Sequence, residues 1–329
     1  MPAPLFAVQY LTAAGLADFA AGNTPILGVV GYGATRPAGL PDACPFAEAP
    51  VVPVTGEAMF EVWNTRAPVE TKGVGAVRGS YNGEVTFGLV ELEEGTDRTF
   101  ETVVEHAYRG LFDFLDAVPC GTPVRFWNYL PHITEEEDGM ERYRRFNVGR
   151  HDAFSDRLTL PVPPVASALG GKVGKPLIYF LAAREPARTI ENPRQVSAYA
   201  YPPIYGPRSP RFSRAATHGN GGAPSLLISG TASIVGHESL HRGDLAAQLG
   251  ETLENIRLLI GEGERQGLPP GRTGWALKAY LRHAEDYEAV HPAVERMFGA
   301  DCQCLYLSAD ICRPELLVEI EAFRMTGAA

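Results

Sequence analysis

The sequence predicts an α+β protein built from two tandem domains, each a mixed sheet with helices packed on one face. The first observation is that the 329 residues are 45% apolar and 21% charged, a globular composition in a chain long enough for two domains. The second is an order of elements that occurs twice: alternating strands, a long helix, a strand, a helix and final strands. We therefore predict an N-terminal domain over residues 1–188 and a C-terminal domain over residues 189–329.

The first half changes from strand spacing to helix spacing at about residue 99. Alternation of apolar residues over 76–92 predicts strands, and Phe100, Val103, Ala107 and Leu111 recur at helical spacing. The remaining predicted elements are a helix over 99–118, a strand over 124–130, a polar helix over 141–154 and a strand over 176–183.

The second half repeats this order. Asp244 is suited to cap the N-terminus of a helix through Leu245, Leu249, Ile256 and Ile260. The other predicted elements are strands within 196–201 and 225–235, a strand over 275–281, a helix over 284–298, and strands over 304–307 and 316–323.

The charge balance and the cysteine count exclude several classes of protein. A net charge of −10 argues against nucleic acid or an anionic membrane as a partner, so an anionic substrate needs a local arginine cluster. Five scattered cysteines do not make a disulfide framework, and the N-terminus lacks the basic region of a signal peptide. No run approaches the ~18 apolar residues of a membrane span. We expect a cytoplasmic protein, and the sequence leaves its oligomeric state open.

Residues 237–241 match H-E-x-x-H, the zinc metalloprotease pattern. This pattern binds zinc only on a helix, which places both imidazoles on one face. Gly236 precedes the segment and Gly243 follows it closely, so we predict a polar loop there. The glycine-rich segments have neither Rossmann nor P-loop spacing. The sequence therefore predicts no metal and no cofactor.

Residues 199–214 contain four prolines, three tyrosines and three arginines. Prolines restrict the backbone and lower the entropy cost of holding arginines in place, and a guanidinium can bind a carboxylate through two hydrogen bonds. The segment therefore predicts an anion-binding site, and the basic stretch over 142–151 predicts a second. The alternative is a rigid loop whose arginines pair with the protein's own carboxylates.

The predicted last strand carries two candidate acids. By alternation Glu319 and Glu321 share one face and Ile320 lies on the other. A buried glutamate is costly unless it is paired or functional, and burial raises its pKa toward that of a general acid. The alternative is an edge strand with both carboxylates in solvent.

Parts of the second half resemble the RidA/YjgF family. The resemblance is carried by Leu227–Gly230, Gly243–Asp244, Ala247–Gln248, Glu254–Ile256 and the closing strand Leu317–Ala322. It implies two tandem RidA/YjgF-like (chorismate mutase-like) units, with ligand clefts between units.

Six blocks from Asn128 onward resemble the chorismatase family, whose members release pyruvate from chorismate without a metal or organic cofactor. The blocks are Asn128–Ile133, Arg145–Arg150, Ala166–Gly170, Tyr205–Arg208, Ser229–Ser233 and Cys312–Glu321. The fold of that family is two RidA-like units, which agrees with the repeated order of elements.

This resemblance implies roles for the candidate site residues. Glu319 would protonate the enolpyruvyl ether, and Cys312 would lie near the ring. Because chorismate carries two carboxylates, two arginine sites are expected. The implied substrate-binding residues are Arg150, Tyr201, Tyr205, Arg208, Arg214, Gly230, Ala232 and Ser233.

The expected products are pyruvate and 3-hydroxybenzoate, because Cys312 resembles the aromatising type; some members of that type also give 4-hydroxybenzoate. Two alternatives stay open. One is a hydrolytic chorismatase that leaves 3,4-dihydroxycyclohexa-1,5-diene carboxylate, and the other is a RidA-like imine deaminase or small-molecule binding protein.

Overall fold

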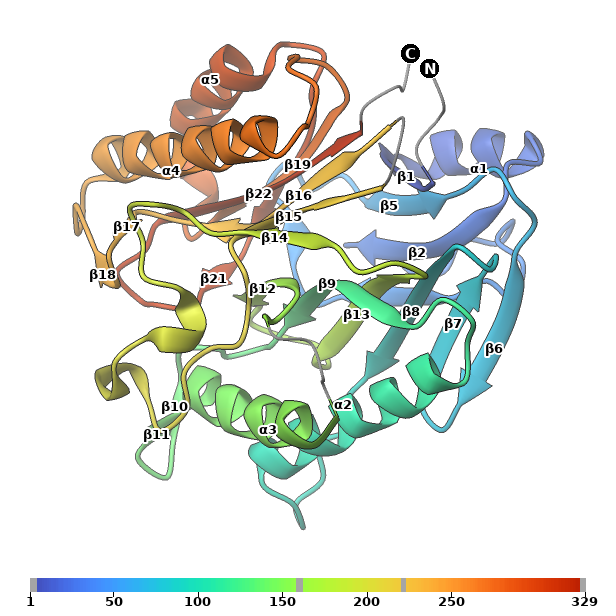
Figure 1. Ribbon diagram of the computed structural model, residues 1–329, viewed down its shortest axis with the longest axis horizontal. Coiled ribbons are helices and arrows are strands. Elements are labelled where there is room, and N and C mark those ends of the chain that lie inside the picture. Colours follow the sequence, from blue (N-terminus) through green and yellow to red (C-terminus); the bar gives the residue numbers. More distant parts are fainter. Residues whose placement is uncertain (1–4, 158–161, 220–222, 326–329) are drawn as a thin grey trace.

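Two seven-stranded sheets face each other at the centre of the molecule, with helices on their outer sides (Figure 1). The structure is a computed structural model that describes residues 5–157, 162–219 and 223–325. A smaller, four-stranded sheet from the N-terminal residues packs beside them. Among the helices of the described residues, none combines the length and the apolar character needed to cross a membrane.

The first sheet has the strand order β21-β12-β9-β13-β8-β7-β6, and helices α2 and α3 pack on one of its faces. The face toward the helices is apolar and aromatic, with Phe126 and Phe180 packed against Phe154 and Phe114. The elements are β6 (Glu70–Val74), β7 (Val77–Tyr81), β8 (Val85–Glu91), α2 (Phe100–Asp116), β9 (Thr122–Tyr129), α3 (Arg142–Arg157), β12 (Val165–Gly170), β13 (Leu177–Ala183) and β21 (Asp310–Ile311).

The second sheet has the order β14-β15-β16-β22-β19-β20-β4 and carries α4 and α5 on its outer face. The predicted cap of α4 is confirmed, since Asp244 Oδ1 accepts a hydrogen bond of 3.0 Å from Ala247 N. The elements are β4 (Val52–Pro53), β14 (Arg188–Ile190), β15 (Ala215–His218), β16 (Ser225–Thr231), α4 (Leu245–Arg265), β19 (Trp275–Leu281), α5 (Tyr287–Phe298), β20 (Gln303–Ser308) and β22 (Val318–Met325).

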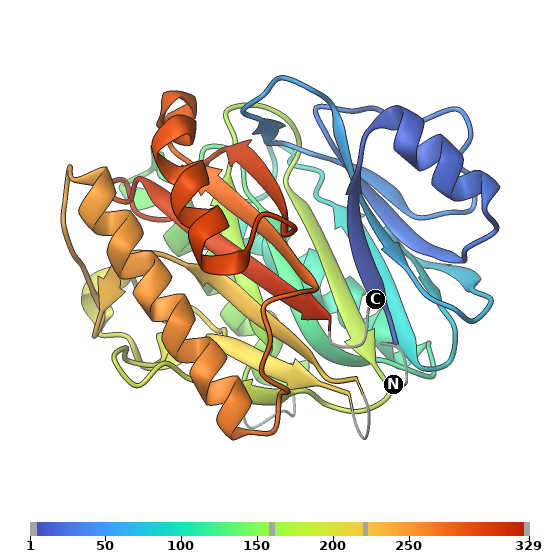
Figure 2. The ribbon, with the colours of Figure 1, turned by 90° about the horizontal axis from the view of Figure 1, so that it is seen from above.

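The N-terminal sheet was not predicted from the sequence. It has the order β1-β5-β2-β3, and in Figure 2 it lies with α1 on the side of the molecule away from α4 and α5. Its strands are short and partly separated by glycine- and proline-rich segments, which give a weak periodic signal. The elements are β1 (Ala7–Leu11), α1 (Ala13–Ala21), β2 (Ile26–Tyr32), β3 (Phe46–Ala49) and β5 (Met59–Asn64).

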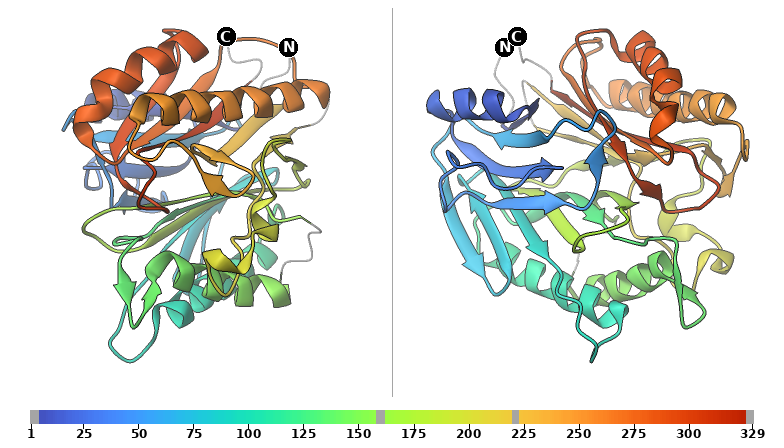
Figure 3. Two further views of the ribbon diagram at one scale, coloured as in Figure 1. Left: turned by 90° about the vertical axis from the view of Figure 1, so that its left-hand side faces the viewer. Right: turned by 180° about the vertical axis from the view of Figure 1, so that it is seen from behind.

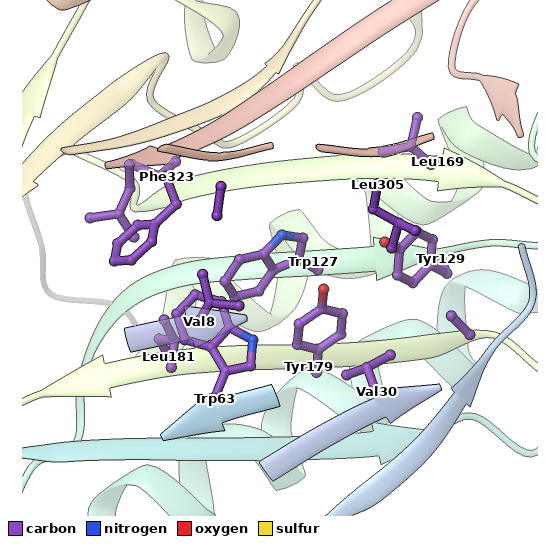
Figure 4. Close-up of a cluster of buried hydrophobic side chains, with 14 of the residues drawn as sticks. Val8, Val30, Trp63, Trp127, Tyr129, Leu169, Tyr179, Leu181, Leu305 and Phe323 are labelled. Carbon is purple, nitrogen blue, oxygen red and sulfur yellow. The ribbon is translucent and has the colours of Figure 1, made fainter. Parts of the chain in front are cut away.

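A single aromatic core joins the three sheets (Figure 4). Trp127 stacks on Tyr179 with ring centroids 4.6 Å apart, and Trp63 from the N-terminal sheet lies 5.4 Å from Trp127 and 5.5 Å from Phe323. Because each sheet contributes rings to the same core, the inner faces of the two large sheets are inaccessible to solvent over most of their area.

The two halves also exchange edge strands. Strand β21, from the C-terminal half, pairs with β12 of the first sheet, and β4, from the N-terminal half, pairs with β20 of the second. The division between residues 188 and 189 stays a prediction.

The predicted helices and strands are confirmed within a few residues, apart from two segments. Residues 196–201 form a 3-10 turn over Ala198–Ala200, because Pro202 and Pro203 follow at once and cannot donate to a sheet. The helix predicted from residue 284 begins with a 3-10 turn, Ala284–Asp286, before α5. Strand β12 was not predicted as a strand.

Two hairpins and the arginine-rich segment complete the fold. The hairpins are β10 (Glu136–Glu137) with β11 (Met140–Glu141), and β17 (Ile234–Val235) with β18 (Glu238–Ser239). Figure 3 shows the yellow segment over residues 198–214 lying near α3 and this second hairpin, with a further 3-10 turn over Pro203–Tyr205.

Candidate active site

A cavity of about 380 Å³ lies where the two large sheets, α3 and the segment over residues 198–214 meet. Both halves of the chain line it, as the resemblance to a cleft between units implied. Of the ten predicted site residues it brings together eight: Arg150, Tyr201, Tyr205, Arg214, Gly230, Ala232, Cys312 and Glu319.

Glu319 on β22 is buried and lines this cavity. Burial raises the pKa of its carboxyl to about 8, and the negative charge of Glu321 adds to the rise, against the opposing effect of nearby arginines. The carboxyl therefore keeps its proton at neutral pH. A protonated carboxyl in a cavity can act as a general acid.

Glu321 lies two residues further along the same face of β22 but is in the opposite protonation state. It accepts hydrogen bonds from Arg125 Nη2 (2.8 Å), Trp127 Nε1 (2.7 Å) and Ser167 Oγ (2.6 Å). Burial alone would raise its pKa, but Lys278 and Arg125 outweigh burial, so its pKa lies below the ordinary value. The sequence placed both acids on one face; their surroundings give one a proton and leave the other charged.

Gly230 at the end of β16 makes room for the Glu319 carboxyl. A Cβ at this position would lie 1.8 Å from Glu319 Oε1 and 3.3 Å from Ser167 Oγ. Its backbone N–H also donates to Ser167 Oγ at 2.9 Å. Any side chain at residue 230 would therefore displace the carboxyl.

Arg150 on α3 is an almost fully buried cation in an aromatic box. Its guanidinium lies over Phe154 (4.7 Å), Tyr108 (5.4 Å), Phe126 (5.7 Å) and Phe146 (5.9 Å). Burial lowers its pKa, and its Nε and Nη2 have no hydrogen-bond partner among the described residues. A buried guanidinium in this condition is suited to receive an anion.

Two further arginines line the cavity, each against a tyrosine. Arg214 Nη2 donates to Tyr201 Oη at 2.7 Å, while its Nε is buried without a partner. Arg313 lies 4.2 Å over the ring of Tyr205 and donates to the carbonyl oxygen of His237 and to Ser239 Oγ.

Arg150, Arg214 and Arg313 form no salt bridge with any carboxylate of the residues that the structure describes. The alternative, a rigid loop over 199–214 whose arginines pair with the protein's own carboxylates, therefore does not hold for Arg214. Glu136, Glu141 and Glu315 also line the cavity, but buried guanidinium nitrogens of Arg150 and Arg214 remain without a partner among the described residues. The site therefore suits a ligand with more than one negative charge.

Two predicted site residues, Arg208 and Ser233, are not among those that line this cavity. Arg208 is exposed on the outer side of the loop, where its charge helps to lower the pKa of His151, after burial of that ring. Ser233 is buried, but its hydroxyl donates to the carbonyl oxygen of Leu240 at 3.2 Å, at the open end of the hairpin of β17 and β18. Neither side chain faces the cavity.

Cys312 and Ala232 are small residues of the lining. Burial, followed by the neighbouring Glu319, raises the pKa of the Cys312 thiol far above its ordinary value. The thiol is therefore neutral and not a nucleophilic thiolate.

The H-E-x-x-H segment is not helical. Glu238 and Ser239 form β18, and His237 is a partner of Tyr205, whose hydroxyl donates to the His237 carbonyl oxygen at 2.7 Å. His241 has a φ of 57°, which no helix contains. The segment is non-helical, as predicted, but it contains strand β18 and is therefore not a loop throughout. Among the described residues no group of three or more His, Cys, Asp or Glu side chains is arranged to hold a metal.

Sequence reasoning missed Arg313, Ser167, Arg125 and Tyr143. Arg313 directly follows Cys312, so its inclusion in the quoted Cys312–Glu321 block was a usable signal. Ser167 likewise lay within a quoted block. Tyr143 lies within the basic stretch over 142–151, which was predicted as an anion-binding site. No sequence signal places Arg125 near Glu319, because β9 is brought to β22 only by the facing of the two sheets.

Comparison with known proteins agrees with this geometry. Residues 61–182 match the family model "Chorismatase FkbO/Hyg5-like, N-terminal". The chain is 38% identical over 315 residues to a 3-hydroxybenzoate synthase of Streptomyces hygroscopicus, covering 91% of this chain and 92% of that protein. It is 36% identical over 312 residues to a chorismatase of Streptomyces rapamycinicus, with the same coverage.

A crystal structure of a chorismatase matches the fold with a TM-score of 0.88 and 30% identity, over 98% of this chain and 99% of that chain. The predicted α+β fold, with mixed sheets that each carry helices on one face, is confirmed. With relatives this similar over nearly its whole length, the chain belongs to the chorismatase family.

Proposed function

We propose that the protein cleaves chorismate to pyruvate and 3-hydroxybenzoate, with Glu319 as the general acid. The observation that carries the proposal is the pairing of one protonated, buried carboxyl with three arginines that lack carboxylate partners in the described part of the chain. Chorismate has a carboxylate on its ring and another on its enolpyruvyl group, so it can meet cations at both ends.

The enol ether needs a proton before it can break. Glu319 delivers its proton to the enolpyruvyl group, which turns pyruvate into a good leaving group as the ring carbon–oxygen bond breaks. In the aromatising outcome the ring's own hydroxyl replaces the departing oxygen and the ring loses a proton. The atoms of pyruvate and hydroxybenzoate then sum to those of chorismate, and no water is consumed.

Two observations support the aromatising outcome over hydrolysis. The relative of 38% identity carries the name 3-hydroxybenzoate synthase. Cys312, the residue by which the sequence resembles the aromatising type, lines the cavity with Glu319. Hydrolysis would instead add one water and leave the dihydroxy-diene.

Incubation of the purified protein with chorismate tests the proposal. Pyruvate is measured enzymatically, and the ring product is identified by its mass and ultraviolet spectrum. Equal amounts of pyruvate and 3-hydroxybenzoate are expected, with the rate unchanged by a chelator. Pyruvate with a water-added diene would indicate the hydrolytic reaction, and no pyruvate at all would reject both.

Arg214 and Arg208 provide a matched pair of variants, because Arg214 lines the cavity and Arg208 is exposed outside its lining. Arg214→Met removes a cation that lines the cavity, and we expect the KM for chorismate to rise about tenfold to a hundredfold, the range for hydrogen bonds to a charged group. Arg208→Met is the matched control, because its side chain is exposed outside the lining, and its KM should stay near wild type. A larger effect at Arg208 would contradict this placement.

A further inference from the structure

Behind Glu319, two acids and two bases form a buried charge cluster: Glu61 on β5, Arg125 on β9, Lys278 on β19 and Glu321 on β22. None of the four residues is more than 3% exposed. Lys278 Nζ lies between the two acids, 2.7 Å from Glu61 Oε2 and 2.9 Å from Glu321 Oε1. Arg125 Nη2 lies 2.8 Å from Glu321 Oε2. The cluster is neutral as a whole and draws its members from all three sheets.

Glu321 is held as a carboxylate by its contacts. Both of its oxygens accept: Oε1 from Trp127 Nε1 and Lys278, and Oε2 from Arg125 and Ser167 Oγ. A protonated carboxyl would have to give up one of these donors, so the charged form is strongly favoured. Neither oxygen lines the cavity, and Glu321 is therefore not placed to touch a substrate.

Glu321 acts on Glu319 through space. The two residues are two positions apart on one face of β22, which places their Cα atoms roughly 7 Å apart. Two like charges at that distance in a buried environment repel strongly, so one of them stays neutral. Lys278 and Arg125 bind the Glu321 carboxylate and stabilise its charge. Glu319, which lines the cavity, is therefore the carboxyl that stays neutral.

We propose that Glu321 is a positioning residue whose fixed negative charge, held by Lys278 and Arg125, keeps the Glu319 carboxyl in its proton-bearing form. This inference rests on the proposed function, in which Glu319 must carry a proton. Burial is the larger contribution to the raised pKa of Glu319 and Glu321 is the next. The groups that face Glu319 are Glu321 on its own strand, Arg125 from β9, Arg214 before β15, Cys312 and Arg313 before β22, Tyr143 from α3 and Tyr280 from β19.

Two carboxyl-to-amide variants test the proposal, since each removes one of the two acids that Lys278 binds. In Glu321→Gln, the like charge is lost and Lys278 and Arg125 are left facing Glu319. Both changes favour the ionised form of Glu319, so its pKa falls. The alkaline limb of the profile of kcat against pH should move down by on the order of one unit or more, with activity at mildly acid pH largely kept.

Glu61→Gln is the matched control. Glu61 is as deeply buried and binds the same lysine, but it lies beyond Lys278 on the N-terminal sheet. Its loss leaves Glu321 with all four of its donors. The alkaline limb should therefore stay where it is in the wild type, whatever the change in thermal stability.

The rate is followed by the loss of chorismate absorbance, which is usable over the whole pH range. An unmoved limb in Glu321→Gln, an equal shift in both variants, or a loss of activity that is uniform in pH would each overturn the proposal. If Glu321→Gln does not fold, the double variant Glu321→Gln with Arg125→Met removes both members of one buried ion pair and leaves Lys278 paired with Glu61, a replacement by neutral groups that is often tolerated. The limb should still move down, because the charge of Glu321 affects Glu319 more than that of Arg125 does, and an unmoved limb there also overturns the proposal.

Failure of the inference is distinguishable from failure of the proposed function. If the wild type releases no pyruvate, or Glu319→Gln retains full turnover, the function is wrong. If the wild type is active and Glu319→Gln is not, while the Glu321→Gln limb is unmoved, only the role of Glu321 is wrong.

Discussion

Glu319→Gln is expected to reduce kcat for pyruvate release by about 10²–10⁴, the usual contribution of a general acid. Glutamine keeps the volume and the hydrogen-bonding atoms of the side chain but has no proton to deliver. Since Arg150, Arg214 and Arg313 are untouched, the KM for chorismate should change little. Steady-state kinetics on the variant, with thermal melting as a test of folding, measure the effect.

The pH dependence provides an internal control for this assignment. With a pKa raised to about 8, Glu319 loses its proton above that pH, so wild-type kcat should fall on the alkaline side. The residual activity of Glu319→Gln should lack this fall, because the amide does not titrate. Turnover close to wild type in the variant, or an alkaline limb that persists in it, would exclude Glu319 as the acid.

Gly230→Ala is the second large effect that we expect. The new Cβ would lie 1.8 Å from Glu319 Oε1, so the carboxyl must move away from its position in the cavity. We expect kcat to fall by a factor approaching that of Glu319→Gln. The cost of overpacking is about 1–3 kcal/mol of stability, which leaves a folded protein for assay.

Gly250→Ala on the exposed side of α4 is the matched control. No atom lies within 4 Å of a Cβ built at that position, and alanine favours a helix over glycine by up to about 1 kcal/mol. Its activity should equal that of the wild type, with an equal or higher melting temperature. A normal kcat in Gly230→Ala would show that the position of the Glu319 carboxyl does not require the absence of a side chain at residue 230.

The elements that were predicted well are those whose own residues carry a regular pattern. Helix α2 buries a periodic apolar face against the first sheet, and β13 and β19 are short, mostly apolar runs that are buried at every residue; both patterns are visible in the sequence. The N-terminal sheet was missed because it completes its core with Trp127 and Phe323, residues far away in the chain. The extended segment expected over 196–201 became a turn because prolines, and not apolar alternation, determine its backbone.

The features of the site also fall into those that the sequence predicts and those that depend on the tertiary structure. From the sequence alone came the α+β class, the family resemblance, the two arginine-rich stretches, and the common face of Glu319 and Glu321, because alternation along a strand and local composition are properties of neighbouring residues. Only the tertiary structure decided that Arg313 lines the cavity while Arg208 lies outside it. It alone decided that Glu321 is the charged acid and Glu319 the protonated one. The physical reason is that protonation depends on burial and on charges within a few ångströms, and here those charges come from Arg125 and Lys278, on strands that meet β22 only in the folded protein.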